Sequence, residues 1–141
     1  LAAGFRSFTD FLGRMDPDDL NREIKTVRSI PVISDLVKDY CDGDFSPLNG
    51  IQVRQPGREF FQSVWKAMRK IPAGKTMSYA ELAERAGSER AVRAAGTACA
   101  RNLIAPIIPC HRVVKSGGAL GNYGYGLDIK EKLLRFEGGL K

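Results

Sequence analysis

An apolar run, residues 107–114, constrains the fold of this chain more than any other segment. Isoleucines precede and valines follow the ionisable pair Cys110 and His111, and His111 is the only histidine among the 141 residues. Such a run is typical of a buried strand or core turn, and burying a polar pair in it is costly unless the pair is hydrogen-bonded or used in chemistry. We therefore expect this segment in the core, with Cys110 and His111 as candidate functional residues.

The pair has two interpretations. Free cysteine is mostly protonated at neutral pH, and a neighbouring histidine is a usual means of generating the thiolate. Adjacent residues of an extended chain point to opposite faces, so cooperation between Cys110 and His111 requires a bend at Pro109 or a bridging water. In the alternative, Cys110 is a buried cysteine that packs as a small hydrophobic residue. The dipeptide alone leaves both open.

Length and cysteine content limit the class of protein. A chain of 141 residues forms one medium domain, or a compact domain with a small appendage. Three cysteines without a Cys-x-x-Cys pair, beside one histidine, argue against a disulfide framework and a zinc site. We expect a reducing, intracellular compartment, with no metal and no cofactor. Since Leu1 stands where a methionine would begin a chain, we expect a processed product or a missing leading segment.

Charge and hydropathy bear on the partners. Residues 1–53 hold 6 Lys/Arg and 9 Asp/Glu, residues 54–115 hold 12 and 4, and residues 116–141 hold 4 and 3. The basic middle thus accounts for the net charge of +6, as expected of a phosphate-binding surface, although many solvated faces look the same. No apolar run approaches the roughly 20 residues that span a bilayer, so no membrane association is expected.

The first part of the chain carries little chemistry. Aromatic residues at helical spacing begin it, and residues 18–27 could form a short polar helix. Pro31, followed by apolar residues at helical spacing and Gly43, predicts an amphipathic helix of about three turns. Residues 42–58 then read as a linker with one short strand at residues 51–53.

The second part predicts a helix-turn-helix. A core helix is expected over residues 59–70. Ser78 and Glu81 form a capping box for a helix over 78–86, and Ser88 is expected to cap a second helix through residue 100. This second helix is rich in Ala and Gly, so it could contact DNA or simply pack tightly against another helix. After the glycine-rich loop 121–126, a last helix is expected over 127–137.

The order of these pieces resembles a known family. The chain contains, in this order, a helix-turn-helix, Asn102, the run Pro-Cys-His-Arg-Val at 109–113, Gly-Asn-Tyr at 121–123 and a helix ending in Glu137. This order is similar to that of the C-terminal domain of the O6-alkylguanine-DNA alkyltransferases. These are also called methylated-DNA–protein-cysteine methyltransferases. The similarity covers about residues 59–138. It implies an α/β fold: a helix-rich domain over 54–141 with a helix-turn-helix and a short active-site strand, after a reduced or divergent region over 1–53.

The resemblance also implies site residues. Cys110 would be the alkyl acceptor, His111, polarised by Glu137, would take its proton through a water, and Asn102 would hold the turn before the active site. Arg93 would be the finger that replaces a flipped nucleotide, and Tyr79 would crowd the target phosphate and donate to the purine. The implied DNA-binding residues are Tyr79, Ala80, Ser88, Arg93, Ala94, Arg101 and Ser116. The implied base pocket consists of Tyr79, Val113, Tyr123 and Gly124.

The implied activity is single-turnover repair of O6-alkylguanine in double-stranded DNA, by a monomer that acts where the DNA is. Gly124 replaces a serine found in many relatives, which puts the range of accepted alkyl groups in question. Three rivals remain. A non-catalytic alkylated-DNA-binding protein would lack the acceptor cysteine, a helix-turn-helix regulator leaves the Cys110, His111 and Glu137 set unexplained, and a cysteine hydrolase would need a further substrate cleft.

Overall fold

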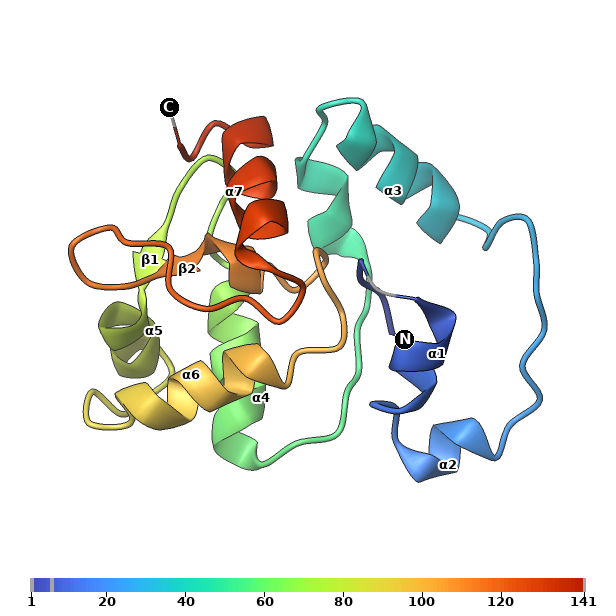
Figure 1. Cartoon of the computed structure of the whole chain (residues 1–141), viewed down its shortest axis with the longest axis horizontal. Helices are drawn as coiled ribbons and strands as arrows, with labels where there is room; N and C mark the ends of the chain where they lie inside the picture. The colour runs from blue at the N-terminus through green and yellow to red at the C-terminus, as the bar shows by residue number, and fades with distance from the viewer. Residues whose placement is uncertain (1, 6, 141) are drawn as a thin grey trace.

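The computed structural model describes residues 2–5 and 7–140, so Leu1 lies outside the described residues. Two short stretches of strand and several helices make up the fold, which agrees with the predicted helix-rich α/β class (Figure 1). The elements are α1 (Phe8–Leu12), α2 (Pro17–Leu20), α3 (Ile33–Cys41), the 3-10 helix η1 (Ser46–Gly50), α4 (Glu59–Met68), β1 (Met77–Ser78), α5 (Tyr79–Arg85), α6 (Val92–Ala100), the 3-10 helix η2 (Cys110–Arg112), β2 (Val113–Val114) and α7 (Leu127–Phe136).

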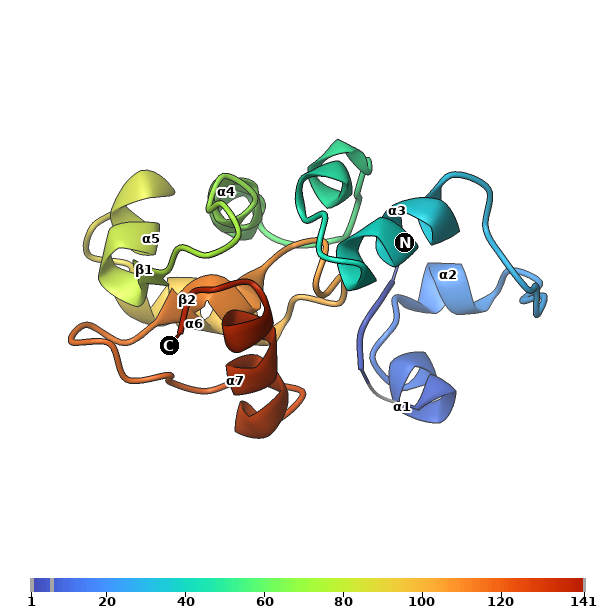
Figure 2. The same cartoon turned by 90° about the horizontal axis from the view of Figure 1, so that it is seen from above.

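The elements fall into two groups. Helices α1 to α3 lie at one end of the molecule and α4 to α7 at the other, in both views (Figures 1 and 2). The first group joins the second along the segment that follows α6. Ala3 forms a parallel bridge with Ile104, its N–H donates to the Leu103 carbonyl at 2.8 Å, and Ala105 N–H donates to the Ala3 carbonyl at 3.0 Å. The N-terminal residues therefore support the chain just before the Cys110 turn.

Two predictions for the first region are wrong. The helix expected over 18–27 ends at Leu20, and residues 21–30 are exposed and non-helical. Short helices need tertiary packing, and the apolar side chains of this segment are largely exposed, with Ile24 at 49% and Val27 at 61%. The strand expected over 51–53 is absent from the described residues, because the Ile51 carbonyl accepts a bond from Arg69 Nη2 (2.8 Å) instead of a ladder partner. The helix predicted after Pro31 is confirmed as α3.

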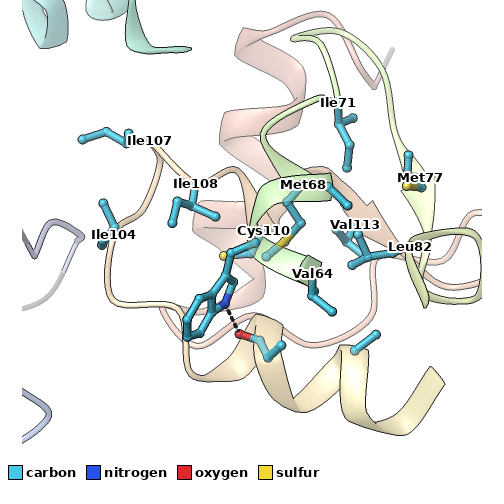
Figure 3. Close-up of a cluster of buried hydrophobic side chains, with 14 of the residues drawn as sticks. Val64, Met68, Ile71, Met77, Leu82, Ile104, Ile107, Ile108, Cys110 and Val113 are labelled. Atoms are coloured by element: carbon cyan, nitrogen blue, oxygen red, sulfur yellow. Dashed lines mark hydrogen bonds between the residues drawn. The ribbon is translucent and has the colours of Figure 1, made fainter. Parts of the chain in front are cut away.

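The core lies between α4, α5 and α6. Val64, Met68, Leu82 and Val113 are fully buried and cluster together with Cys110 (Figure 3). The indole N–H of Trp65 donates to the carbonyl of Ala98 at 2.9 Å, which ties α4 to α6. The helix expected over 59–70 is thus confirmed as the central core helix.

The helix-turn-helix is confirmed in outline. Both bonds of the capping box at the start of α5 are present, and Gly87 leaves that helix at a positive φ of 106°. Ser88 does not cap α6, contrary to the prediction. Helix α6 begins after Ala91 without a side-chain cap, and the Ser88 carbonyl instead accepts from Ala91 N–H at 3.0 Å, which closes a turn between the helices.

A two-stranded parallel sheet links this helix pair to the Cys110 segment. Met77 pairs with Val113 and Ser78 with Val114. Helix α5 begins at Tyr79, directly after β1, so its start is held beside the segment that follows the Cys110 turn. A glycine turn at Gly117 and Gly118 follows β2, but it forms no hairpin between described strands. Within residues 2–5 and 7–140, no helix has the length and apolar character needed to cross a membrane.

Candidate active site

The chain bends at Pro109, which is one of the two arrangements under which Cys110 and His111 could cooperate. Pro109 has φ −84° and ψ 65°, and Cys110 to Arg112 follow as one turn of 3-10 helix before β2 begins. The turn separates the directions of two neighbouring side chains: Cys110 lines a cavity, whereas His111 is fully buried behind it. A tight turn rather than an extended strand therefore presents the thiol, which is 5% exposed.

Asn102 holds the thiol from one side. Its Nδ2 donates to the Ile108 carbonyl at 2.8 Å and to Cys110 Sγ at 3.3 Å. Its Oδ1 accepts from Ile104 N–H at 3.1 Å and from Gln55 Nε2 at 3.1 Å. A carboxamide has two donors and two acceptor sites, so all four are used. Asn102 closes the turn after α6 and contacts the sulfur directly, in keeping with the position predicted for it.

Glu137 collects donors on the other side. His111 Nε2 lies 2.9 Å from Glu137 Oε1, and Tyr40 OH donates to the same oxygen at 2.7 Å. Arg112 donates from Nε to Oε2 at 2.9 Å and from Nη2 to Oε1 at 2.8 Å. Burial alone would raise the pKa of Glu137, but the hydrogen bonds from His111 and Arg112 outweigh it and lower that pKa to about 2. Glu137 is therefore an ionised acceptor at neutral pH.

The state of His111 follows from this network. Burial lowers the pKa of His111, against the opposing effect of Glu137, so the ring is neutral at pH 7. Since the ionised Glu137 can only accept, the ring proton is assigned to Nε2 and the lone pair to Nδ1. His111 Nδ1 is buried, and no described protein atom forms a hydrogen bond with it. The imidazole is thus arranged as a base whose lone pair faces away from Glu137.

Burial also sets the state of the thiol. It raises the pKa of Cys110, while the hydrogen bond from Asn102 and the charge of Lys130 act in the opposite direction. Lys130 is fully buried in α7 and donates to the Val113 carbonyl at 2.6 Å and to the Asn122 carbonyl at 3.3 Å. Burial lowers the pKa of Lys130 to about 8, which leaves it largely charged at neutral pH. The site therefore holds a thiol that needs a base to ionise.

Cys110 opens onto a cavity of about 440 Å³, within the size range of small-molecule pockets. Its wall comes from α5, α6 and the glycine-rich loop. The lining residues are Tyr79, Val92, Arg93, Gly96, Thr97, Cys99, Ala100, Cys110, Lys115, Asn122, Tyr123 and Gly124. Of the residues predicted for a base pocket, Tyr79, Tyr123 and Gly124 line this cavity. Val113 is fully buried and does not, and its carbonyl is bonded to Lys130.

The residues predicted for a DNA surface are more spread out. Ala80, Arg93, Arg101 and Ser116 are exposed, and Ser88 and Ala94 are half-buried. Of these, Arg93 alone also lines the Cys110 cavity. Arg101 follows α6 and lies over the ring of Phe61 at 5.7 Å, away from the cavity wall. Arg93 and Tyr79 are therefore the two predicted DNA contacts that line the same cavity as the thiol.

Four residues of the site were not predicted: Tyr40, Gln55, Arg112 and Lys130. The sequence does mark Lys130 as buried. It precedes Leu134 by four residues and Glu137 by seven, a spacing that places all three on the buried side of α7. Arg112 is part of the motif, but no local pattern marks it as a partner of Glu137. Tyr40 and Gln55 lie more than 40 residues before their partners, so no local pattern marks them.

Fold and site together define a helix-turn-helix domain built around a buried cysteine that lines a cavity, and the comparisons place that domain in a family. The model described as "6-O-methylguanine DNA methyltransferase, DNA binding domain" matches residues 59–139. The chain belongs to this family. A curated relative, the methylated-DNA–protein-cysteine methyltransferase of Methanosarcina acetivorans, is 49% identical over 88 residues, which cover 62% of this chain and 56% of the relative. The chain thus spans little more than half the length of that relative.

Solved structures extend the similarity. Mycobacterium tuberculosis OGT in complex with DNA has a TM-score of 0.69 and 39% identity, covering 76% of this chain and 66% of that chain. The O6-methylguanine-DNA methyltransferase of Pyrococcus kodakaraensis has a TM-score of 0.66 and 26% identity, covering 92% of this chain and 74% of that chain. An alignment that omits only 8% of the chain must include most of residues 1–53. The first region therefore has a structural counterpart, which its sequence pattern did not reveal.

Proposed function

We propose that this protein repairs O6-alkylguanine in double-stranded DNA by transferring the alkyl group irreversibly to its own Cys110. One observation carries the proposal: the Cys110 thiol lines the same cavity as Arg93 and Tyr79 of the helix-turn-helix, with the neutral base His111 as its chain neighbour. Family membership and the DNA complex of the Mycobacterium tuberculosis relative add support.

The chemistry follows from the residue states. The Cys110 thiol gives its proton to His111 Nδ1 through a bridging water, and the resulting imidazolium is stabilised by the ionised Glu137. The thiolate attacks the O-alkyl carbon, a carbon–sulfur bond forms and the bond to guanine O6 breaks. Burial raises the pKa of Tyr79 to about 12, so its hydroxyl is protonated and would give a proton to the departing guanine anion. The proton taken up by His111 then returns through solvent to Tyr79, so the Cys110 proton ends on guanine. The thioether product does not revert, so each molecule acts once.

The target base must leave the duplex to reach a thiol that is 5% exposed. Extruding a base costs a few kcal/mol of stacking and pairing. Arg93 is exposed on α6 and lines the cavity, and it would enter the base stack and offset that cost. The same helix pair would hold Ala80, Ser88, Ala94 and Arg101 near the DNA backbone. At Gly124 the pocket wall carries no side chain, so we expect room for alkyl groups larger than methyl.

The remaining expectations belong to this proposal. The active unit is a monomer on DNA, in the compartment where the DNA is. It needs neither metal nor cofactor, because Cys110 is the nucleophile and the guanine of the substrate is the leaving group. Residues 54–141 would carry the DNA-binding and transfer functions, and residues 1–53 would support them.

Intact-mass analysis after mixing with an O6-methylguanine duplex tests the proposal. The wild-type protein should gain one methyl group, and Cys110→Ala should gain none while binding the duplex with nearly unchanged affinity, because phosphate contacts supply most of the affinity. Cys99→Ala is the matched control, since Cys99 is the other cavity-lining thiol and should not be needed. Methyl transfer to another residue of Cys110→Ala would refute the assignment. Tight binding by wild-type protein without a mass gain would instead favour non-catalytic recognition of the lesion.

Arg93→Ala tests the flipping step. Single-turnover transfer from the duplex should slow far more than transfer from free O6-benzylguanine, which needs no flipping. Arg90→Ala, an exposed arginine before α6 that does not line the cavity, is the control. A phosphate-only role for Arg93 would weaken DNA binding broadly and lower the salt dependence of that binding. It would not produce the contrast between transfer from the duplex and transfer from the free base.

A further inference from the structure

Gln55 has no assigned role, yet it is among the few buried polar side chains of the described residues. It lies between η1 and α4, outside the segment 59–139 that matches the family. Its side chain makes two bonds. Oε1 accepts from Leu103 N–H at 3.0 Å, and Nε2 donates to Asn102 Oδ1 at 3.1 Å. Its main-chain carbonyl is fixed in turn by Gln62 Nε2 at 2.7 Å.

These bonds give the Gln55 amide one orientation. Leu103 N–H can only donate, so the oxygen of Gln55 must face Leu103 and its NH₂ group must face Asn102. Asn102 is oriented in the same way, because Ile104 N–H requires the oxygen of its amide. A chain of hydrogen bonds therefore runs from Leu103 through Gln55 and Asn102 to Cys110 Sγ, with every donor facing an acceptor.

We propose that Gln55 is a positioning residue for alkyl transfer: it holds the Asn102 amide so that Nδ2 donates to Cys110 Sγ. This inference rests on the proposed function for its biological meaning. A donor at the sulfur favours the thiolate over the thiol, and hydrogen bonds to ionised groups are stronger than neutral ones. The bond from Gln55 withdraws electron density from Asn102 Oδ1, and linked hydrogen bonds polarise one another, so it strengthens the donor that the thiolate needs.

Gln55→Glu is the sharpest test, because it keeps the shape of the side chain. One carboxylate oxygen can still accept from Leu103 N–H, while the other faces Asn102 Oδ1, acceptor against acceptor. At low pH the protonated carboxyl can donate to Asn102 Oδ1 and restore the bond. Gln52→Glu is the matched control, since it places the same charge on an exposed residue of the same segment.

The measurement is the rate of Cys110 alkylation by iodoacetamide against pH, followed by peptide mass analysis, in the full chain. This rate reports the thiol and needs neither DNA nor methyl transfer, so a failed repair assay would not affect it. We expect Gln55→Glu to react about tenfold more slowly at pH 7, as expected for a weakened bond to an ionised group. The difference should shrink as the pH falls and the introduced carboxyl is protonated, and Gln52→Glu should behave as wild type.

A pH profile of Gln55→Glu equal to that of Gln52→Glu would overturn the proposal. So would a loss of rate that is the same at every pH, because a merely structural role has no reason to recover with protonation. Circular dichroism establishes that the variant is folded. If it is not, Gln55→Met, which keeps the length of the side chain and lacks both polar atoms, is measured in its place. A wild-type profile for Gln55→Met overturns the proposal, and a raised apparent pKa of Cys110 supports it.

Discussion

The two ends of the molecule differ in how far their side chains are buried. Among the described residues before position 40 no side chain is buried, and several large apolar ones, such as Phe8 and Val27, are 61% exposed. From α4 onward, helices and turns pack around fully buried residues such as Leu82 and Leu134. The first region nevertheless places Tyr40 on the Glu137 carboxylate. A loosely packed region can therefore complete a site through one well-placed contact.

The largest effect is expected for Glu137→Gln, within the tightly packed region. It leaves Arg112 buried without its counter-charge, and breaking one partner of a buried pair costs about 3–5 kcal/mol. The variant should also transfer methyl groups more slowly, because His111 loses the carboxylate that stabilises its charged form. Urea unfolding and single-turnover rates measure the two effects. His111→Gln should slow transfer with a smaller loss of stability, and unchanged rates in both variants would refute the role of the relay.

The hydrogen-bond network around Glu137 predicts that the free energy of unfolding decreases at acid pH. The folded-state pKa of Glu137 is about 2, below the unfolded value of about 4.3, so its contribution is full above pH 4.3 and is lost as the pH falls towards 2. The pKa of His111 is also lowered by burial, so a further loss should begin as the pH falls below about 6.5. Unfolding free energies between pH 8 and pH 3 test both windows. Glu137→Gln should lose the lower window.

Leu82→Ala is expected to come next. The side chain is fully buried between the core helices, and removing it leaves a cavity at a cost of about 2–5 kcal/mol. The midpoint of urea unfolding should fall without a change in the chemistry of Cys110. A cost below 1 kcal/mol would mean that this end of the molecule is no better packed than the other.

Tyr40→Phe should have an intermediate effect, because it removes one contact between the regions and leaves the ring in place. A bond to a charged group is worth about 1.5–3 kcal/mol, and Glu137 keeps its other donors. Transfer should slow less than in Glu137→Gln. An unchanged stability and rate would indicate that the first region completes nothing in the site.

Val27→Ala should have the smallest effect. The side chain is exposed in a segment without helix or strand, and surface substitutions of this kind usually stay within about 0.5 kcal/mol. A loss comparable to that of Leu82→Ala would show that the segment around Val27 is packed in solution, and the contrast between the two regions would fail.

The elements predicted correctly are those whose signals are local. The capping box at Ser78, the stripe of α4 and the stop at Gly43 act within a few residues, and each is present. One local prediction failed, because the Ser88 carbonyl closes a turn and its side chain does not cap α6. Two other predictions failed in the first region. The segment 18–27 is polar and its few apolar side chains stay largely exposed, and residues 51–53 have strand residues without a neighbouring strand among the described residues.

The sequence by itself identified Cys110 and His111 as a candidate pair and predicted that they lie in the core. Pro109 bends the chain and the apolar flanks bury it. The order of the helix-turn-helix, Asn102, the run at 109–113 and Glu137 points to the family, whose model matches residues 59–139. Only the tertiary structure decided what surrounds the pair. Tyr40 and Gln55 reach Glu137 and Asn102 across 97 and 47 residues, and which nitrogen of His111 is free depends on the donors gathered on Glu137. The physical reason is that a hydrogen bond depends on distance and orientation in space, which a local pattern does not specify.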